Sequence, residues 1–368
     1  MTARLGGSAG VPGVGRDPGP ARDDVDTAIR VVDAHVHIAV DELFAGPTPL
    51  DPSVAEVREV QGRRRLFTGG KELTSVVGEL FDPRAMLQDA RAHGIDHLLL
   101  SPWVQLLPNG LAVREARRRC EVQCEALAAV VASDPGHISA VGAVPIDHPR
   151  EAVSALRAAC AAGLAGVEVA ASCADYLGDD SLERLWSAAE ELGAVVFVHP
   201  ATRGIPLHAL DRHYLWNTVG NPMETAIAAA HLTMNGVLER HPGLVVLLAH
   251  GGGALSAVRG RMAHGQMSVP ASRGRLSEPV ERSLGRFYFD TVTHDQRQLE
   301  RLIEDFGATR VLLGSDRPFD MGDPDPVSSV RLLGLCGPDE RAVLGGNAAR
   351  LLRLGDHPRS AGAATGGE

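Results

Sequence analysis

Eight short apolar runs recur along the chain, and several of them are hydrophobic on both faces. Residues 98–100 read LLL, 195–198 read VVFV and 244–248 read LVVLL, so no polar residue interrupts either face of these segments. Strands with this pattern are buried on both sides, as in a parallel sheet covered by helices. We therefore predict parallel strands at 30–37, 96–102, 137–145, 165–172, 194–200, 244–250, 286–292 and 310–316.

Helical patterns fill the segments between these runs. Residues 179–193 begin with aspartates and end at a glycine, and a second helix is predicted to start with Asn221 as its N-cap and Pro222 in its first turn. The alternation predicts an α/β protein, and its eight repeats favour a single (β/α)8 TIM-type barrel. A doubly wound open sheet is the alternative, but no GxGxxG follows the first strand. The long loops after strands 1 and 5, residues 38–80 and 200–220, are expected to build the substrate pocket.

The two ends of the chain differ from the rest in composition. Residues 1–28 and 357–368 are rich in small residues, so we expect disordered tails around a barrel that spans 29–356. The formal net charge of −10 argues against a nucleic-acid partner, because phosphate binding needs a basic surface. The five cysteines form no CxxC pair, and no apolar run approaches the ~20 residues that cross a bilayer. Without a secretion-signal pattern, we expect a cytoplasmic protein with no membrane partner.

Polar residues recur where the apolar runs end. His35 and His37 close the first run, His199 the fifth, His250 the sixth and Asp316 the eighth. In a parallel barrel these positions share the C-terminal rim, where barrel active sites lie. Imidazole and carboxylate bind borderline metals such as Zn²⁺, which lowers the pKa of a bound water to ~7. A mononuclear site built from the other four residues leaves His250 to take or give a proton.

The strand-end motifs resemble those of the amidohydrolase superfamily: DAHVH at 33–37, VFVHP at 196–200, LLAHGGG at 247–253 and LLGSD at 312–316. Within it, residues 31–355 are similar to the branch of aminocarboxymuconate-semialdehyde decarboxylase. The likeness is strongest after residue 190, in the segments 219–265, 285–295 and 346–354. It implies a barrel enzyme that loses CO2 from a carboxylic acid.

The resemblance also implies how the metal is held. It assigns the ligands of a single Zn²⁺ as His35, His37, His199 and Asp316. It implies that His250 activates the metal-bound water or polarises the substrate. Binuclear relatives carry a carboxylated lysine on the fourth strand, whereas this chain has Glu168 and no lysine there, so we expect one metal ion per chain. Mn²⁺ and Co²⁺ also bind such ligand sets.

The substrate-binding positions match the family less well. Arg261 corresponds to a family arginine that binds a substrate carboxylate. A second family arginine is absent; Ser75 lies near its place, and Lys71 is a candidate substitute. Arg203 and Arg317 stand where the decarboxylase has other residues, and they are further candidates to bind the substrate. We therefore expect a substrate other than aminocarboxymuconate semialdehyde.

Three functions remain open at this point. The leading prediction is decarboxylation of a small aromatic or unsaturated carboxylic acid, in which Asp316 acts in catalysis as well as in metal binding. The same centre could instead hydrolyse a lactone, amide or ester, or hydrate a double bond. A protein that binds a metabolite without catalysis is the third alternative. Arg273 and Arg275 lie either in a solvated loop or at the pocket of a second subunit, since the resemblance is compatible with a homodimer.

Overall fold

A computed structural model describes residues 30–45, 50, 55–68, 70–73, 78–173, 176–201 and 203–355. The predicted tails, 1–28 and 357–368, lie outside these residues, and so does Ser75. In the part of the chain that is described, every helix is too short or too polar to cross a bilayer.

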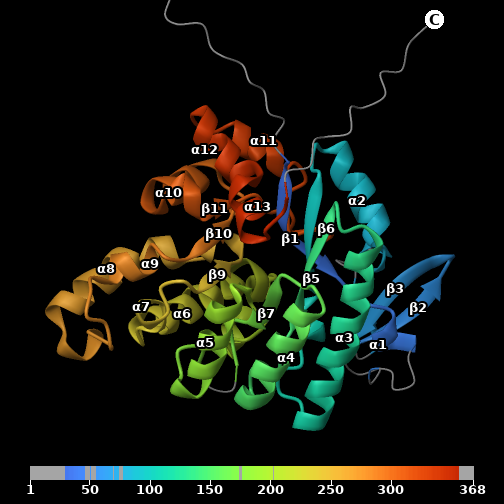
Figure 1. The fold of residues 1–368 in the computed structure, drawn as a ribbon, viewed down its shortest axis with the longest axis horizontal. Coiled ribbons are helices and arrows are strands. Elements are labelled where there is room, and N and C mark those ends of the chain that lie inside the picture. Colours follow the sequence, from blue (N-terminus) through green and yellow to red (C-terminus); the bar gives the residue numbers. More distant parts are fainter. Residues whose placement is uncertain are drawn as a thin grey trace, which may run out of the picture.

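Eight parallel strands form one sheet whose spatial order follows the order of the chain (Figure 1). They are β1 (Val32–Ile38), β5 (His97–Pro102), β6 (Ile138–Ala143), β7 (Gly166–Ala170), β8 (Val195–His199), β9 (Val245–Leu248), β10 (Tyr288–Asp290) and β11 (Val311–Leu312). Seven of them fall within a predicted apolar run, and β1 extends one residue beyond the end of its run, so the eight predicted strands are confirmed.

The chain after β11 returns to β1 and closes the barrel. The backbone N–H of Asp316 donates to the His35 carbonyl over 2.9 Å, and the N–H of His37 donates to the Arg317 carbonyl over 2.8 Å. A single TIM-type barrel is therefore confirmed, and the open doubly wound sheet is excluded. The closure also places Asp316 beside the two histidines of β1.

Helices cover the outside of the barrel. They are α1 (Glu42–Ala45), α2 (Pro83–Ala92), α3 (Val113–Ser133), α4 (Pro149–Ala161), α5 (Glu183–Leu192), α6 (Asn221–Met234), α7 (Val237–Arg240), α8 (Leu255–Ser268), α9 (Val280–Leu284), α10 (Gln296–Phe306), α11 (Pro326–Arg331), α12 (Gly337–Arg341) and α13 (Asn347–Leu351). In Figure 1, α3, α4 and α5 form a row along one side of the strands. Between each strand and the next, these helices supply the crossover that a parallel sheet requires.

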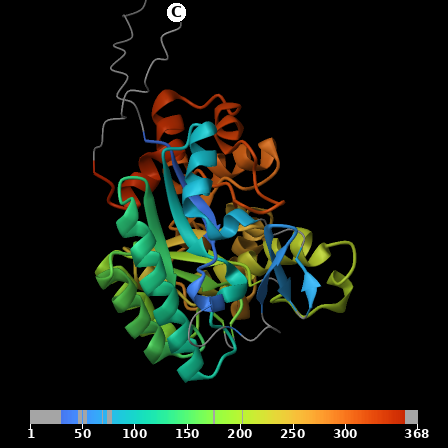
Figure 2. The same cartoon turned by 90° about the vertical axis from the view of Figure 1, so that its right-hand side faces the viewer.

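The first long loop contains structure that the sequence pattern did not predict. It carries a three-stranded antiparallel sheet of β2 (Glu56–Val60), β3 (Arg63–Thr68) and β4 (Lys71–Glu72). In Figure 2 this small sheet and the helices α3 to α5 lie on opposite sides of β1. Its strands are largely charged and partly exposed, so they lack the apolar signal of the barrel strands.

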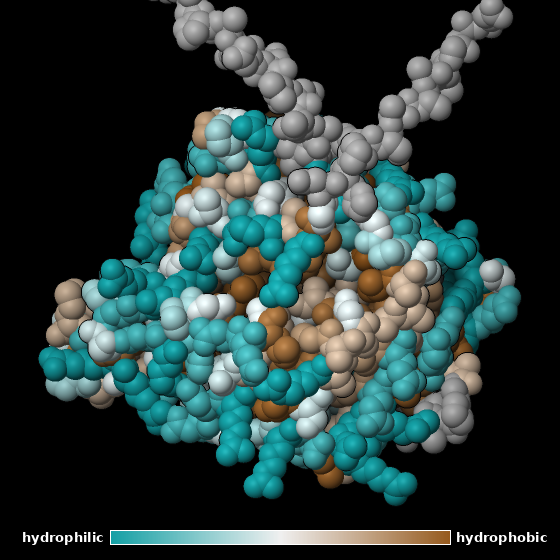
Figure 3. Space-filling model, viewed as in Figure 1, coloured by the Kyte–Doolittle hydropathy of each residue, from teal (hydrophilic) through white to brown (hydrophobic). Residues whose placement is uncertain are grey.

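Apolar side chains pack in two shells. One cluster lies inside the barrel and comprises Val32, Ala34, Leu99, Val141, Val195, Phe197, Leu247, Ala249, Tyr288, Leu312 and Ala348. Strand residues whose side chains lie on the other face of the sheet, such as Leu98 and Leu100, belong to a larger cluster that includes the helices. The strands are apolar on both faces because both faces are buried. The exterior seen in Figure 3 is mostly hydrophilic, with hydrophobic residues gathered in a central area.

The start of α6 differs from the prediction. A π-helical turn at Trp216–Gly220 precedes Asn221 and runs directly into the helix. Asn221 is therefore the first helical residue and makes no capping hydrogen bond, so its predicted role as N-cap was wrong. Pro222 does lie in the first turn, as predicted.

Candidate metal centre

A bulge in β1 sets the direction of its two histidines. The pairing of β1 with β5 shifts register between Asp33 and Val36. Before the shift, Val32 belongs to the cluster inside the barrel; after it, Val36 belongs to the outer cluster. His35 and His37 are therefore both directed into the barrel and are fully buried. Bulges of this kind often redirect side chains next to active sites.

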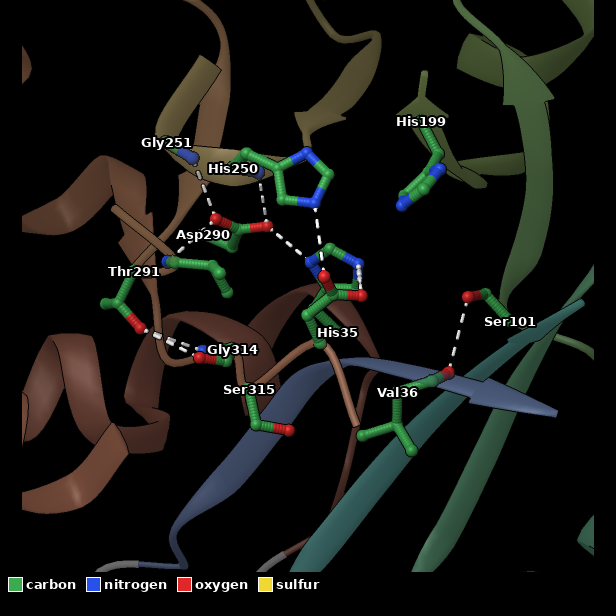
Figure 4. Close-up of polar contacts among 12 residues, drawn as sticks. His35, Val36, Ser101, His199, His250, Gly251, Asp290, Thr291, Gly314 and Ser315 are labelled. Carbon is green, nitrogen blue, oxygen red and sulfur yellow. Dashed lines mark hydrogen bonds and ion pairs between the residues drawn. The ribbon is translucent and has the colours of Figure 1, made fainter. Parts of the chain in front are cut away.

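Imidazole nitrogens and a carboxylate converge at the C-terminal end of the barrel (Figure 4). His35 Nε2 and His37 Nε2 are 3.0 Å apart, and Asp316 Oδ1 lies 3.3 Å from the first and 3.1 Å from the second. The ring of His199 lies 4.7 Å from that of His37, and its Nε2 has no hydrogen-bond partner in the described part of the chain. Two metal–nitrogen bonds of about 2.0–2.1 Å bring their nitrogens about 3 Å apart, so these distances fit a shared metal ion.

The second nitrogen of each of these histidines is fixed by an acceptor. The contacts are His35 Nδ1 to Asp290 Oδ2 at 2.6 Å, His37 Nδ1 to the Pro102 carbonyl at 3.4 Å and His199 Nδ1 to the Pro200 carbonyl at 3.0 Å. An acceptor at Nδ1 requires a proton there, which leaves the Nε2 lone pair directed into the cluster. This arrangement is typical of histidines that bind a metal.

His250 lies at the edge of the same cluster, two residues after the end of β9. Its backbone has a φ of 57°, and its N–H donates to Asp290 Oδ2 over 2.8 Å. Its Nε2 is 3.4 Å from Asp316 Oδ2, while its Nδ1 has no partner among the described residues. Ligand atoms of His250, His35, His199 and Asp316 all lie within 4.8 Å of one another. The geometry thus offers two histidines, His37 and His250, for the fourth ligand.

Two buried carboxylates dominate the charge of the centre. Burial opposes a charge on His35, but Asp316 and Asp290 outweigh it and raise the pKa of His35 to about 10. Burial likewise opposes charge on Asp316, yet His35 and its neighbours hold the pKa of that carboxyl well below its usual range. Burial and the surrounding imidazoles hold the pKa of His199 well below its ordinary value, so this ring is neutral. The two carboxylates therefore attract a positive charge, which without a metal ion is the proton on His35.

Glu168 lies on β7, the fourth barrel strand. The side chain is fully buried, and neither carboxylate oxygen has a hydrogen-bond partner in the described part of the chain. Burial raises the pKa of Glu168 well above its usual value, so the carboxyl is neutral. The one His/Cys/Asp/Glu group within the described ranges that could hold a metal ion does not include this residue.

A cavity of about 1020 Å³ opens above the centre. His199, His250 and Asp316 form part of its wall, and the two long loops contribute Thr68, Leu73, Arg203, Tyr214, Trp216, Asn217 and Thr218. The prediction that loops after strands 1 and 5 build the pocket is thus confirmed. The cavity gives a small molecule access to the cluster.

The structure brings only one of the three predicted substrate-binding arginines to this cavity. Arg203 lines it, with its guanidinium 3.2 Å from Asp211. Arg261 is exposed on α8 and does not line the cavity. Arg317 turns away from the cavity, forming an ion pair with Asp89. Its position after Asp316 gave no indication of that direction, because Asp89 is 228 positions away in the sequence.

The remaining basic candidates have other surroundings. Arg275 forms an ion pair with Asp180 of the same chain, and Arg273 is exposed. Lys71 is exposed on β4 and does not line the cavity.

Asp290 organises the centre, although the strand-end pattern did not predict a role for it. Its carboxylate accepts from the N–H groups of His250, Gly251 and Val292 in addition to the bond with His35. The sequence feature that could have identified Asp290 is a lone acidic residue within the apolar run at 286–292. It was overlooked because that run continues to Val292, so the aspartate does not end it.

Fold and site together define a class of protein: a (β/α)8 barrel with a His/Asp metal-binding group at its C-terminal rim. A family model of Amidohydrolase matches residues 32–354. The chain therefore belongs to the amidohydrolase family, and the resemblance found in the strand-end motifs is confirmed.

Curated proteins to which this chain is similar in sequence include decarboxylases. The 2-amino-3-carboxymuconate-6-semialdehyde decarboxylase of Dictyostelium discoideum is 27% identical over 296 residues, which cover 79% of this chain and 82% of that protein. The gamma-resorcylate decarboxylase of Rhizobium sp. (strain MTP-10005) is 28% identical over 309 residues, covering 77% and 88%. The solved structure of a dihydroxybenzoic acid decarboxylase from Polaromonas sp. JS666, with bound manganese and 2-nitroresorcinol, has a TM-score of 0.74 at 20% identity, covering 89% of this chain and 98% of that one.

Proposed function

We propose that this protein is a metal-dependent decarboxylase that acts on a small aromatic or unsaturated carboxylic acid. The observation that carries the proposal is the convergence of buried imidazole nitrogens and the Asp316 carboxylate at the floor of a cavity. The similarity to decarboxylases over most of the chain supports the choice of reaction.

The metal is proposed to be a single Zn²⁺, with Mn²⁺ or Co²⁺ as alternatives. Its proposed ligands are His35, His37, His199 and Asp316. The orphaned Nε2 of buried His199 and the short distances among the other ligand atoms support this set. The bound metal supplies a Lewis acid that polarises a substrate oxygen. Manganese in the Polaromonas structure shows that such a barrel also accommodates that ion.

His250 is proposed to handle the proton. Breaking the bond between the ring or alkene carbon and the carboxyl group leaves the electron pair on that carbon, which must then bind a proton. His250 lines the cavity, and its buried Nδ1 has no protein partner among the described residues, so this nitrogen is not committed to another protein group. Asp316 lies 3.4 Å from His250 Nε2 and orients the ring.

Arg203 is proposed to bind a carboxylate or phenolate oxygen of the substrate. It is the one predicted arginine that lines the cavity, and its guanidinium offers two parallel donors to such a group. Its ion pair with Asp211 is largely exposed, so the pair can rearrange around a ligand at little cost.

Product analysis in deuterated water tests the reaction type. The metal-loaded protein is incubated with hydroxybenzoic, aminobenzoic and muconic semialdehyde acids, and separately with lactones and esters. Decarboxylation predicts CO2 and a product with one deuterium on the carbon that carried the carboxyl group. Hydrolysis or hydration without CO2 would show that the same centre performs the alternative reaction.

A further inference from the structure

Asn221 lines the cavity, and the proposed mechanism gives it no part. It is the first residue of α6 and makes no capping hydrogen bond, so its amide does not serve the helix. The residue is 6% exposed, and its Oδ1 is buried without a hydrogen-bond partner in the described part of the chain. Its Nδ2 likewise meets no acceptor among the described residues. Such a buried amide is rare, because it loses hydrogen bonds to water and gains none from the protein.

Other amide side chains on the cavity wall are less buried. Gln105, Asn217 and Gln298 also line the cavity, and each is partly exposed, so water can reach it. Among the described lining residues, Asn221 is the amide that is buried. Its missing hydrogen bonds therefore have to come from what occupies the cavity, which is either ordered water or a ligand.

The backbone of Asn221 is fixed from both sides. Its N–H donates to the Trp216 carbonyl, and its own carbonyl accepts from Thr225 Oγ1 over 3.2 Å. The preceding turn, Trp216–Gly220, is π-helical, and turns of this kind are rare and frequently occur at functional sites. Three residues of that turn also line the cavity. The amide is therefore presented to the cavity from a rigid element, as a precise binding group requires.

The start of α6 packs against the turn that follows His250. The Pro222 carbonyl accepts from the N–H of Ala254 over 3.0 Å, and a side chain at Gly253 would collide with the same carbonyl. The Gly253 N–H in turn donates to the His250 carbonyl over 2.8 Å. Asn221 and His250 therefore belong to adjoining parts of the cavity wall. A group bound by Asn221 would lie on the side of the cavity where the proton is proposed to be delivered.

We propose that Asn221 is a specificity-determining residue whose amide binds an uncharged hydroxyl group of the substrate. A hydroxyl both donates and accepts, so it can bond to Oδ1 or to Nδ2, and rotation about the last side-chain bond brings either atom to the ligand. An ionised substituent would be left without an opposite charge, since the amide is neutral. The inference rests on the proposed function in taking the cavity as the substrate site. The metal centre and Arg203 remain the proposed partners of the carboxyl group.

Pairs of hydroxyl- and methyl-substituted acids test the proposal, because the two groups are similar in size and only the hydroxyl forms hydrogen bonds. The probes are ortho-, meta- and para-hydroxybenzoic acid with the matching methylbenzoic acids. Stopped-flow quenching of tryptophan fluorescence gives the Kd before turnover, because Trp103 and Trp216 line the cavity, and CO2 release gives the turnover. The metal-loaded full chain is compared with Asn221→Leu, Asn221→Ala and the control Asn235→Leu. Asn235 is the C-cap of the same helix, donates to the His231 carbonyl and does not line the cavity.

At one ring position or more, the hydroxyl acid is expected to bind about three- to tenfold more tightly than its methyl partner. Asn221→Leu and Asn221→Ala are expected to lose this preference at such a position, and Asn235→Leu to keep it. Because the preference is a ratio of two affinities of one protein, a general effect of a substitution on folding cancels, and either Asn221 variant alone is sufficient if the other does not fold.

Three outcomes contradict the proposal. They are a hydroxyl preference that persists at every position in the Asn221 variants, equal binding within each pair by the wild type, as expected if the amide holds only water, and no binding of any probe. CO2 release without the preference overturns this inference and leaves the proposed function standing; the preference without CO2 from any acid does the reverse.

Discussion

His35 Nδ1 and Asp290 Oδ2 lie 2.6 Å apart, and both side chains are fully buried. The two residues are 255 positions apart in the sequence, on the first and seventh strands of the barrel. Because the carboxylate holds a proton on Nδ1, Nε2 is the nitrogen of His35 that faces His37 and Asp316 and that can bind a metal ion once its own proton is lost. Asp290 therefore positions a proposed metal ligand without contacting the metal.

Replacing Asp290 is expected to weaken metal binding. In Asp290→Asn, an amide donor faces the N–H of His250 and no longer fixes the His35 ring, so metal affinity is expected to fall about 10- to 100-fold. The measurement is competition against a chromophoric chelator. Asp305→Asn is the control, because Asp305 is a buried carboxylate paired with Arg259 away from the centre. Equal metal affinities for Asp290→Asn and wild type would show that Asp290 does not position the metal ligand His35.

Metal binding is expected to release a proton. The carboxylates Asp316 and Asp290 overcome the effect of burial and raise the pKa of His35 to about 10, so its ring is protonated at neutral pH. A metal ion on His35 must displace that proton, and affinity is therefore expected to rise about tenfold per pH unit below about pH 10. Calorimetry in buffers of different ionisation enthalpy counts the protons. A count of zero near pH 7 would contradict this account of the centre.

Two variants decide which histidine is the fourth ligand. His37→Asn is expected to lose the metal, because its Nε2 lies 3.0 Å from that of His35 and 3.1 Å from Asp316. His250→Asn is expected to keep the metal and to lower kcat about 10²- to 10⁴-fold, since it removes the proposed proton donor. Metal content is measured by atomic emission on the purified variants. Loss of the metal in His250→Asn and its retention in His37→Asn would make His250 the fourth ligand and contradict its role as the proton donor.

Acid stability is expected to depend on His97, which lies at the start of β5. Burial lowers the pKa of His97 to about 4, and its ring nitrogens contact Gly136 O and Ser139 Oγ as a neutral imidazole. The unfolded state, with a pKa near 6.5, binds the proton first, so stability falls as the pH drops from about 6.5 to 4, by about 3 kcal/mol in all.

A matched pair of variants isolates this contribution. His97→Gln cannot take up the proton, so the pH dependence of its free energy of unfolding in urea is expected to be flatter over that window. His93→Gln, at the exposed C-terminus of α2, is expected to follow the wild type. Parallel curves for wild type and His97→Gln would contradict the prediction.

Much of the barrel could be predicted from the sequence because its strands are buried on both faces. Continuous runs such as 195–198 and 244–248 leave no solvent face, as expected for strands of a parallel sheet that is covered on both faces. The rim positions of His199, His250 and Asp316 followed from the ends of those runs. The charged β2–β4 sheet has no such signal, because its stability comes from pairing within a loop.

Other features of the site depend on contacts between distant residues. The bulge in β1 becomes visible only from the register of its pairing with β5. The motifs made Arg261 and Arg317 candidates by their positions in the sequence, but they did not show which way the side chains point. Arg317 forms an ion pair with Asp89 on α2. Tyr214 and Trp216 reach the cavity through a loop whose left-handed residues cannot be read from the sequence.

We propose that the metal centre and Asp316 together drive decarboxylation. The most direct measurement is CO2 release from hydroxylated and aminated aromatic acids by wild type and Asp316→Asn, each normalised to bound metal. The account predicts CO2 from the metal-loaded wild type, none after metal removal, and a loss in Asp316→Asn larger than its loss of metal. CO2 release that survives metal removal, or an Asp316→Asn variant inactive only in proportion to its missing metal, would contradict it.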